Sequence, residues 1–219
     1  LAAARTGCRT VLFTISNDAV GNMPCNPSIG GTGKGQLVFE IDALGGEMGR
    51  AADKVMLQDR MLNMSKGPAV RSKRIQADRR MYQDIMKKTI EHTENLSLVQ
   101  AEICEIRRLN ENGDGERFEL VSRLSALWRA KTVVICTGTY LDSRVIIGEV
   151  IYPSGPDGLH PAAYLTKSLE ALGIKMLRFK TGTPPRIDAR SVDYSVLERQ
   201  DGEKKLTPYS ADTDIKELD

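Results

Sequence analysis

Continuous apolar runs and helically spaced apolar positions alternate along this chain, and that alternation is typical of an α/β protein. The run over residues 10–15 predicts a buried parallel strand, because a strand covered on both faces has no polar side. Further runs predict strands over residues 57–64, 96–103, 130–139 and 175–180. Helical spacing predicts helices over residues 36–44, 47–56, 72–92 and 161–172.

The helix over residues 36–44 has a defined apolar side. Leu37, Ile41 and Leu44 share one face, and Gly45-Gly46 ends the helix. Three acids of this region could act as bases, but a place on a solvated helix face is the favoured interpretation: Asp42, Glu47 and Asp53.

The helix over residues 72–92 combines an apolar face with many cations. Its apolar positions are Ile75, Tyr82, Ile85, Met86 and Thr89. The basic residues on and beside it are Arg71, Lys73, Arg74, Arg79, Arg80, Lys87 and Lys88. Such a face could follow an RNA backbone, or it could be an ordinary solvated face.

The middle of the chain predicts a small antiparallel insert over about residues 103–129. Asn110 to Gly115 is a hairpin signal, and the flanking segments 103–109 and 116–121 are its expected strands. Residues 142–160 are rich in glycine and proline without a strong pattern, so a further domain is expected to start at about residue 142 and to run to 219. The sequence from residue 197 onward is polar and predicts no element.

Composition adds few constraints. Hydrophobic residues make up 41% and charged residues 27% of the 219 positions, as in ordinary globular proteins, and the net charge of +2 by itself predicts no nucleic-acid partner. Four widely spaced cysteines without a C-x-x-C pair argue against a metal site or a disulfide framework and fit a reducing cytosol: Cys8, Cys25, Cys104 and Cys136. No run of about eighteen apolar residues occurs, so no membrane contact is expected.

The densest candidate chemistry lies in residues 25–35, which hold one cysteine, one lysine and four glycines. Glycines allow left-handed backbone and close approach to a ligand, and a helix starting just after them directs N–H groups toward the loop. Three interpretations compete. The stretch could be a packing turn, a flavoprotein loop with a reactive Cys25, or a P-loop. The P-loop motif does not match, because Ser28 stands where it needs glycine and Gly35 stands where it needs serine or threonine.

Two other loops carry cations at fixed positions. Lys66 and Arg71 flank a Gly-Pro turn, and Lys180 and Arg186 flank Pro184-Pro185. Either pair could hold a phosphate or another anion. The alternatives are solvent-exposed basic residues in the first loop and a rigid crossover in the second.

Three further positions have ordinary explanations. Ser16 or Asn17 could reach a ribose at the end of the first strand, but a simple turn is favoured. Cys136 is expected to be a core thiol within its strand. His160 has no evident partner and is expected to be a loop histidine.

The longest motifs resemble the GidA/MnmG family of flavin-dependent tRNA uridine-modifying enzymes. The resemblance covers essentially the whole chain, in order, through residues 25–35, 40–46, 63–71, 76–79 and 180–188. It implies part of an FAD-binding domain of the glutathione-reductase type. Residues 1–7 look like the end of a helix running into a strand, so this domain is expected to lack its first strand and Gly-x-Gly-x-x-Gly loop, and the family's sequence to continue beyond Asp219.

The resemblance also implies site residues. Cys25 would be the reactive thiol. Cofactor contacts would come from Gly30, Gly31, Gly33, Lys34, Ile103 (through its main chain), Thr137 and Gly138. The site or tRNA phosphates would be lined by Lys66, Arg71, Arg74, Arg79, Lys180 and Arg186.

The implied activity is synthesis of the 5-carboxymethylaminomethyl group on the wobble uridine of tRNA. FAD would be reduced by NADH, and methylenetetrahydrofolate would supply the one-carbon unit. A GTPase of the MnmE type would be the partner of a cytoplasmic homodimer. Two other classes stay open: a flavin oxidoreductase acting on a small molecule, and a non-catalytic RNA-binding module.

Overall fold

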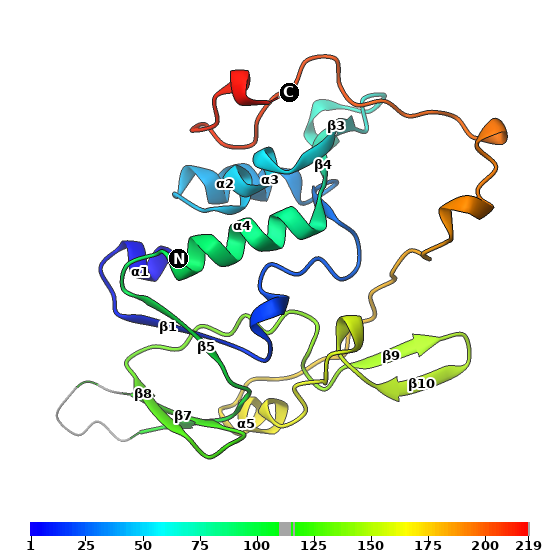
Figure 1. Ribbon diagram of the computed structural model, residues 1–219. Helices are drawn as coiled ribbons and strands as arrows, with labels where there is room; N and C mark the ends of the chain where they lie inside the picture. Colours follow the sequence, from blue (N-terminus) through cyan, green and yellow to red (C-terminus); the bar gives the residue numbers. More distant parts are fainter. Residues whose placement is uncertain (110–114, 116, 219) are drawn as a thin grey trace. The chain divides into compact units, whose positions relative to one another are not determined.

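The computed structural model describes residues 1–109, 115 and 117–218 (Figure 1). These residues form two compact units, each treated by itself below. The first unit comprises Leu1–Leu12, Asn17–Leu98 and Gly182–Asp219, and the second comprises Phe13–Ser16 and Val99–Thr181.

The α/β class is confirmed. Along the chain up to residue 100 the elements are α1 (Ala2–Arg5), β1 (Thr10–Thr14), β2 (Ser28–Gly30), α2 (Gly35–Ala43), α3 (Met48–Lys54), β3 (Met56–Leu62), β4 (Ser72–Ala77), α4 (Arg79–Glu91) and β5 (Leu96–Gln100). The following elements are β6 (Ile103–Arg108), β7 (Phe118–Ser122), β8 (Leu127–Ala130), β9 (Arg144–Ile147), β10 (Val150–Pro153) and α5 (Leu165–Ala171). The described residues after 182 contain three short 3₁₀ turns, at Ala189–Ser191, Tyr194–Val196 and Ile215–Glu217.

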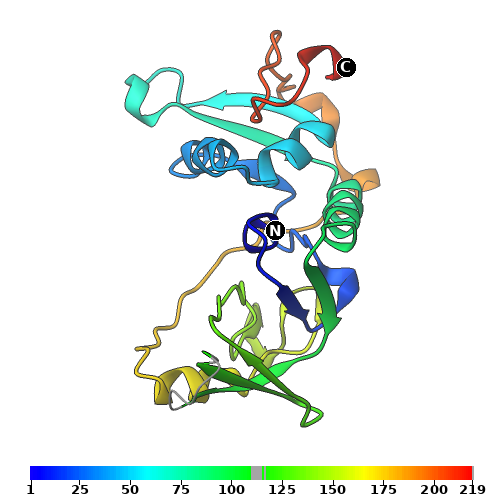
Figure 2. The same cartoon turned by 90° about the vertical axis from the view of Figure 1, so that its left-hand side faces the viewer.

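The core of the first unit lies between an antiparallel sheet and helices. The sheet has the order β2-β4-β3, with Ile29 and Asp59 both opposite Ile75. In Figure 2, α2 and α3 lie on one side of the β3–β4 ribbon. The residues buried in this core include Ile29, Val38, Ala51, Ala52, Val55, Ile75, Ala77, Tyr82 and Tyr209.

The first predicted strand is confirmed as β1, which pairs with β5. The two strands run in the same direction, because Thr10 donates to the carbonyl of Asn95 and Ala101 donates to that of Thr14. The strand is only partly buried, with Val11 exposed, so the expectation of full burial is wrong.

The single helix predicted over residues 72–92 is a strand followed by a helix. Burial alternates along β4, where Ile75 is fully buried, and this is the period of a strand rather than of a helix. Asp78 then caps α4 by accepting from Arg80 N (2.9 Å) and Met81 N (3.0 Å). Lys73 and Arg74 therefore belong to the sheet and not to the basic helix face.

The predicted helices over residues 36–44 and 47–56 are confirmed as α2 and α3. In α2, the residues that share the apolar face are not the buried ones. Val38 is its buried apolar residue, whereas Leu37, Ile41 and Leu44 are 50%, 42% and 88% exposed. The sequence pattern identifies an apolar stripe correctly, but this stripe does not face the sheet.

The second unit contains the antiparallel sheet β6-β7-β8, which confirms antiparallel strands in the two segments predicted on either side of the hairpin signal. The expected hairpin turn at residues 110–115 lies almost entirely outside the described residues. Helix α5 packs on this sheet through Leu165 and Leu169, which share a core cluster with Ile106 and Leu120. Phe13 meets Trp128 edge-on, with ring centroids 4.8 Å apart.

Two predicted strands of the second unit are wrong. The structure describes no strand within residues 131–139 or within 174–180, and Val134 is 82% exposed. Apolar runs form strands only where a neighbouring backbone completes their hydrogen bonds, and neither segment has one among the described residues. Cys136 is accordingly exposed rather than a core thiol.

Two boundaries in the second unit also differ. Helix α5 begins at Leu165 rather than at Pro161, because Ala162 bonds to Tyr140 and bridges to Leu141 instead. Residues 142–160, for which the sequence predicts no element, contain the two-stranded ribbon β9–β10 (Figure 1). No helix in the described part of the chain is both long and apolar enough to cross a membrane.

Candidate functional site

Residues 25–35, expected to be one loop, contain a short strand. Ser28–Gly30 pairs with β4 as an edge strand, and a tight turn then leads into α2 at Gly35. Gly30 has a φ of +84°, and a Cβ there would lie 1.8 Å from the hydroxyl of Tyr209. A Cβ at Gly35 would lie 2.8 Å from the carbonyl of Lys73. Both glycines therefore permit close packing inside the protein.

The turn over residues 31–34 is rigidly held. Gly31 N donates to Lys73 O (2.7 Å), and Ser72 Oγ donates to Gly31 O (2.6 Å). The same Gly31 carbonyl accepts from Lys34 N and Gly35 N at 2.9 Å. Gly33 has a φ of +72°, and a Cβ there would have no neighbour within 4 Å, so this position needs glycine for its backbone angle and faces open space.

The Lys66–Arg71 loop is joined to this turn. Asn63, itself at a positive φ of 59°, donates from Nδ2 to Thr32 Oγ1 and to Val70 O, both at 3.0 Å. Arg71 Nε donates to Lys66 O at 3.3 Å, and both side chains are exposed. One amide thus ties the glycine turn to the loop that carries the two cations.

The proline loop also reaches this region of the first unit. Cys25 Sγ donates to Gly182 O at 3.2 Å, and Arg186 Nη2 donates to Pro24 O at 3.4 Å. Cys25 is half-buried and is a free thiol. Lys180, the other cation of that loop, belongs to the second unit, where it is exposed.

The cations expected on one helix face are divided between two elements. Arg74 lies in β4 opposite Gly30, and its Nε is buried without a hydrogen-bond partner in the structure. Arg79 lies in the first turn of α4 and donates to Asn22 Oδ1. The expected continuous basic face from residue 71 to 88 is therefore shorter, because it begins only with α4.

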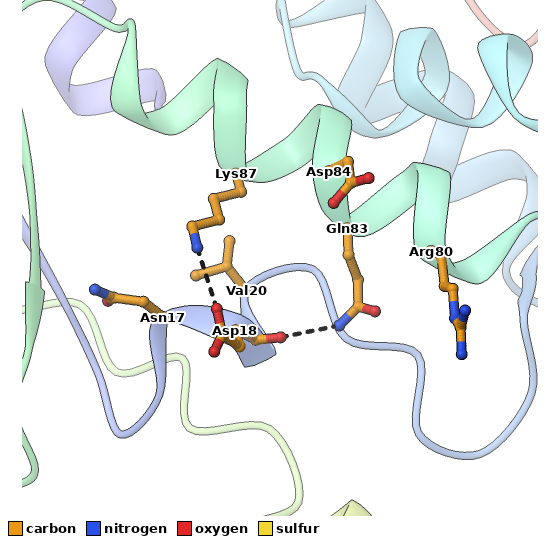
Figure 3. Close-up of a pocket in the computed structure, with 7 residues that line it drawn as sticks. All are labelled: Asn17, Asp18, Val20, Arg80, Gln83, Asp84 and Lys87. Atoms are coloured by element: carbon orange, nitrogen blue, oxygen red, sulfur yellow. Dashed lines mark hydrogen bonds and ion pairs between the residues drawn. The ribbon is translucent and has the colours of Figure 1, made fainter.

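Helix α4 forms one wall of a cavity of about 260 Å³ (Figure 3). Lys87 pairs with Asp18 (3.2 Å), and Gln83 donates to the carbonyl of Asp18 (3.3 Å), which fixes the turn at Asn17–Ala19 against the helix. Asn17 begins this 3₁₀ segment and Ser16 precedes it directly, so the turn favoured for this position is present from Asn17 onward. The cavity is lined by two cations, Arg80 and Lys87, and two carboxylates, Asp18 and Asp84, so its lining has no net charge that would attract an anion.

The expected cofactor residues of the second unit are separate within it. Ile103 starts β6 opposite Ser122. Thr137 and Gly138 form a turn in which Tyr140 N donates to Thr137 O at 3.3 Å, and Gly138 has a φ of +56°. The expected turn is present, although the strand that was to lead into it is not.

Sequence reasoning missed a buried polar network in the first unit. Lys73 and Asp59, with side chains 3% and 4% exposed, form an ion pair of 2.8 Å, and Lys73 also donates to the carbonyl of Thr207. The expectation that Lys73 lies on a solvated helix face is therefore wrong. A charged residue inside an alternating strand pattern gives no signal of burial, since its carboxylate partner lies on another strand.

Asp53 is likewise buried rather than solvated. It accepts from Tyr209 N (2.8 Å), Ser210 N (2.9 Å) and Thr213 Oγ1 (2.8 Å). The segment after residue 197, for which the sequence predicts no element, is therefore fastened to α3. Burial, together with Asp59 and Asp53, raises the pKa of Tyr209, whose hydroxyl donates to Lys73 O (2.7 Å).

His160 in the second unit does have a partner. Its Nε2 lies 3.1 Å from Glu102 Oε2, which also receives Arg123 Nη1 at 3.2 Å. Burial and then Glu102 raise the pKa of the Cys104 thiol, against an opposing effect of Arg123. No group of three or more metal-ligating side chains occurs among the residues that the structure describes.

The chain is similar to known proteins over nearly its whole length. A family model described as "Glucose inhibited division protein A" matches residues 1–217. A curated relative from Caldicellulosiruptor saccharolyticus, named tRNA uridine 5-carboxymethylaminomethyl modification enzyme MnmG, is 53% identical over all 219 residues, which correspond to 34% of its own length. The protein of the same name from Clostridium kluyveri is 53% identical over 210 residues, or 96% of this chain and 33% of the relative.

A solved structure is also similar. Aquifex aeolicus GidA in its form II crystal has a TM-score of 0.87 and 40% sequence identity, covering 97% of this chain and 34% of that one. The chain thus spans about a third of the length of the relatives it matches.

Proposed function

The chain belongs to the glucose inhibited division protein A (GidA) family, and on that premise we propose that it acts in building the 5-carboxymethylaminomethyl group on the wobble uridine of tRNA. The observation that carries the proposal is the match of the whole chain, at 53% identity, to a relative named for this modification. Because the chain corresponds to a third of that relative, activity is proposed for the protein that contains it.

FAD is the proposed cofactor, and the exposed part of the glycine turn fits an anionic group. Thr32, Gly33 and Lys34 are exposed, Gly33 faces open space, and α2 starts directly after them. A hydroxyl, backbone N–H groups and an ammonium are donors suited to a phosphate or a reduced flavin ring. When bound, FAD would supply the hydride transfer that side chains cannot perform.

The glycines of the motif differ in role, because Gly30 and Gly35 pack closely against protein atoms whereas Gly33 faces open space. We assign direct cofactor contact to Gly33 and Lys34, which are exposed. Gly30 and Gly31 have a supporting role, because Gly30 packs closely on Tyr209, and Gly31 is buried with its N–H and carbonyl bonded to protein groups. In the second unit, the main chain of Ile103 and the turn at Thr137 and Gly138 remain proposed cofactor contacts.

Cys25 is the proposed reactive thiol. A thiol that adds to carbon 6 of uracil makes carbon 5 nucleophilic, and the same group could instead assist proton transfer. Its partial exposure leaves the sulfur accessible, and the hydrogen bond to Gly182 O orients it. The proton on Sγ must leave before the sulfur can attack, and the Gly182 carbonyl can accept that hydrogen bond but not the proton.

The proposed contacts to tRNA phosphates or the site rim differ in how available they are. Lys66, Arg71, Lys180 and Arg186 are exposed. Arg74 and Arg79 are partly buried, and Arg79 already bonds to Asn22. We therefore expect the exposed cations to contribute most of the salt-dependent affinity.

The finer parts of the function are proposals of the same kind. They comprise reduction of FAD by NADH, methylenetetrahydrofolate as one-carbon donor, an MnmE-type GTPase partner, a homodimer and a cytoplasmic location. We also propose that residues 1–219 are an incomplete dinucleotide-binding domain, with an insert at about 103–129 and a further domain starting at about 142.

The test is mass spectrometry of tRNA nucleosides from cells that carry the full-length gene, intact or as Cys25→Ser. We expect the 5-carboxymethylaminomethyl uridines to disappear in the mutant while the protein stays folded and yellow. Cys8→Ser is the matched control, because Cys8 is an exposed free thiol outside the site.

The outcomes separate the alternatives. Unchanged modification in Cys25→Ser would reduce Cys25 to a structural thiol. Unchanged modification after deletion of the whole gene would reject the function and favour a flavin oxidoreductase that acts on a small molecule.

A further inference from the structure

The first unit contains a second cavity, of about 340 Å³, which lies beside the buried ion pair. We call it the methionine pocket. Its walls come from α2, β3, β4, the loop after β3 and the segment after residue 200. Its volume lies within the range of about 300–1,000 Å³ that small-molecule sites occupy.

One side of the methionine pocket is apolar and open. It is formed by Phe39, Met61 and Met64, and Phe39 and Met64 are 42% and 56% exposed. The ring of Phe39 is held by Tyr209, with centroids 4.8 Å apart. A fixed aromatic ring flanked by polarizable thioethers is a suitable surface for a flat ring of a ligand.

The lining also carries three cations: Arg71, Lys73 and Lys205. Arg71 and Lys205 line the pocket, and neither pairs with a carboxylate among the described residues. Lys73 at the floor pairs with Asp59, and the acceptors described for it take two of its three N–H groups. Glu203 is the other lining carboxylate, and its Oε1 is held by Met61 N at 3.0 Å. The lining therefore favours an anion.

We propose that the methionine pocket binds one nucleotide, with its base against Phe39 and Met64 and its phosphate on Arg71 and Lys205. A flat ring joined to a phosphate suits both the apolar residues and the two cations without an ion-pair partner, which outnumber the one remaining lining carboxylate, Glu203. The nucleotide could be free or part of an RNA strand. Choosing RNA rests on the function proposed above, whereas the pocket itself rests on its lining.

The test is saturation-transfer NMR of UMP with the purified chain. We expect saturable binding, with the strongest transfer to the base protons H5 and H6, and weaker binding of uridine because it lacks the phosphate. Phe39→Ala and Arg71→Ala should each raise Kd about tenfold, the effect of one stacked base or one charge-assisted hydrogen bond. Glu203→Gln should lower Kd, because it removes a negative charge from the wall.

Matched controls lie outside the pocket. Leu57→Ala removes an exposed apolar side chain of β3, and Arg9→Ala removes an exposed cation, so both should leave Kd within about twofold. If Phe39→Ala does not fold, Met64→Ala tests the same apolar part of the pocket, because Met64 is mostly exposed and its removal should not affect folding. Absence of saturable UMP binding, or an unchanged Kd in Phe39→Ala, Met64→Ala and Arg71→Ala, would overturn the proposal.

Competition with a single-stranded uridine pentanucleotide distinguishes a free nucleotide from one that is part of an RNA strand. Displacement of UMP by the pentanucleotide at lower concentration than by UMP itself supports RNA, and equal concentrations support a free nucleotide in the same pocket. The assay is also independent of the proposed function. If gene deletion left tRNA modification unchanged, UMP binding that depends on Phe39 and Arg71 would still establish the pocket.

Discussion

Tyr82 shows how burial controls the chemistry of a single residue. It is 5% exposed in the core of the first unit. Burial, with a smaller contribution from Glu47, raises the pKa of its hydroxyl to about 12. Because an unfolded tyrosine loses its proton near pH 10, the neutral form contributes stability that is complete below pH 10 and is lost as the pH rises toward 12.

We therefore expect alkaline destabilisation that Tyr82→Phe reduces. Between pH 8 and pH 11 the free energy of unfolding of the natural chain should fall by about 1.4 kcal/mol more than that of Tyr82→Phe. Urea denaturation at the two pH values measures the difference. The control is Tyr194→Phe, which removes an exposed tyrosine and should behave like the natural chain. Identical pH dependence in Tyr82→Phe and the natural chain would contradict the expectation.

The residues that could be predicted from sequence are those with local signals. The glycine turn before α2 and the need for positive φ at Gly31 and Gly33 follow from short-range geometry. The reason for Gly30 could not be predicted, because its neighbour Tyr209 lies far along the chain. The partners of Asp53 and His160 are likewise long-range, and sequence patterns do not encode them.

At the scale of elements, the junction of β4 and α4 depends on Asp78. Its carboxylate accepts from two N–H groups of the first turn, while its own N–H donates to Val55 O at 2.8 Å. The residue thus ends the strand and starts the helix. An aspartate placed just before an amphipathic segment is the usual sign of a helix start, and it contradicts a helix that runs through it from residue 72.

Asp78→Ala should lower the free energy of unfolding by about 1 kcal/mol through loss of the cap. Urea denaturation of the purified chain at pH 7 measures the change. Glu91→Ala is the control, since Glu91 is an exposed acid in the last turn of the same helix and should change stability by no more than about 0.5 kcal/mol. Equal effects of the two substitutions would show that Asp78 acts only as a surface charge.

Whether a predicted element is present in the structure depends on where its backbone hydrogen-bond partners come from. Helices α2 and α3 could be predicted because a helix satisfies its own hydrogen bonds. The strands expected over residues 130–139 and 175–180 needed neighbours, and the described chain offers none. The ribbon β9–β10 was missed because its glycine-rich surroundings hide two short apolar strands.

For the whole molecule, the first unit is discontinuous in sequence. Its core joins residues 17–98 to residues 182–219, and Asp53 provides three of the hydrogen bonds between them. Its carboxylate holds two backbone N–H groups and one hydroxyl of the later segment. Removal of the carboxylate leaves buried donors unsatisfied, which costs more than the bonds themselves contribute.

We expect Asp53→Ala to release the segment around Tyr209, so that trypsin can bind the backbone at Arg199, Lys204 and Lys205, whose side chains are already exposed. Cleavage there should become at least about tenfold faster, the factor that corresponds to a loss of 1.4 kcal/mol. Mass spectrometry of fragments over time measures it, and Asp53→Asn, which retains one acceptor, should lie between. The control is Glu94→Ala, which removes an exposed acid distant in sequence from the cleavage sites. Unchanged cleavage in Asp53→Ala would show that other contacts hold the segment.

The anchoring of Tyr209 by Asp53 has a consequence for protein synthesis. During translation the N-terminal part of a chain leaves the ribosome first. The antiparallel sheet β6-β7-β8 therefore emerges before the segment that contains Tyr209. During that interval Asp53 is translated but lacks its partners, and the pocket for the Tyr209 ring is empty. A nascent chain stalled before residue 209 should therefore carry a formed second unit and an unfinished first unit, which is the stage at which a chaperone would find the most exposed apolar surface.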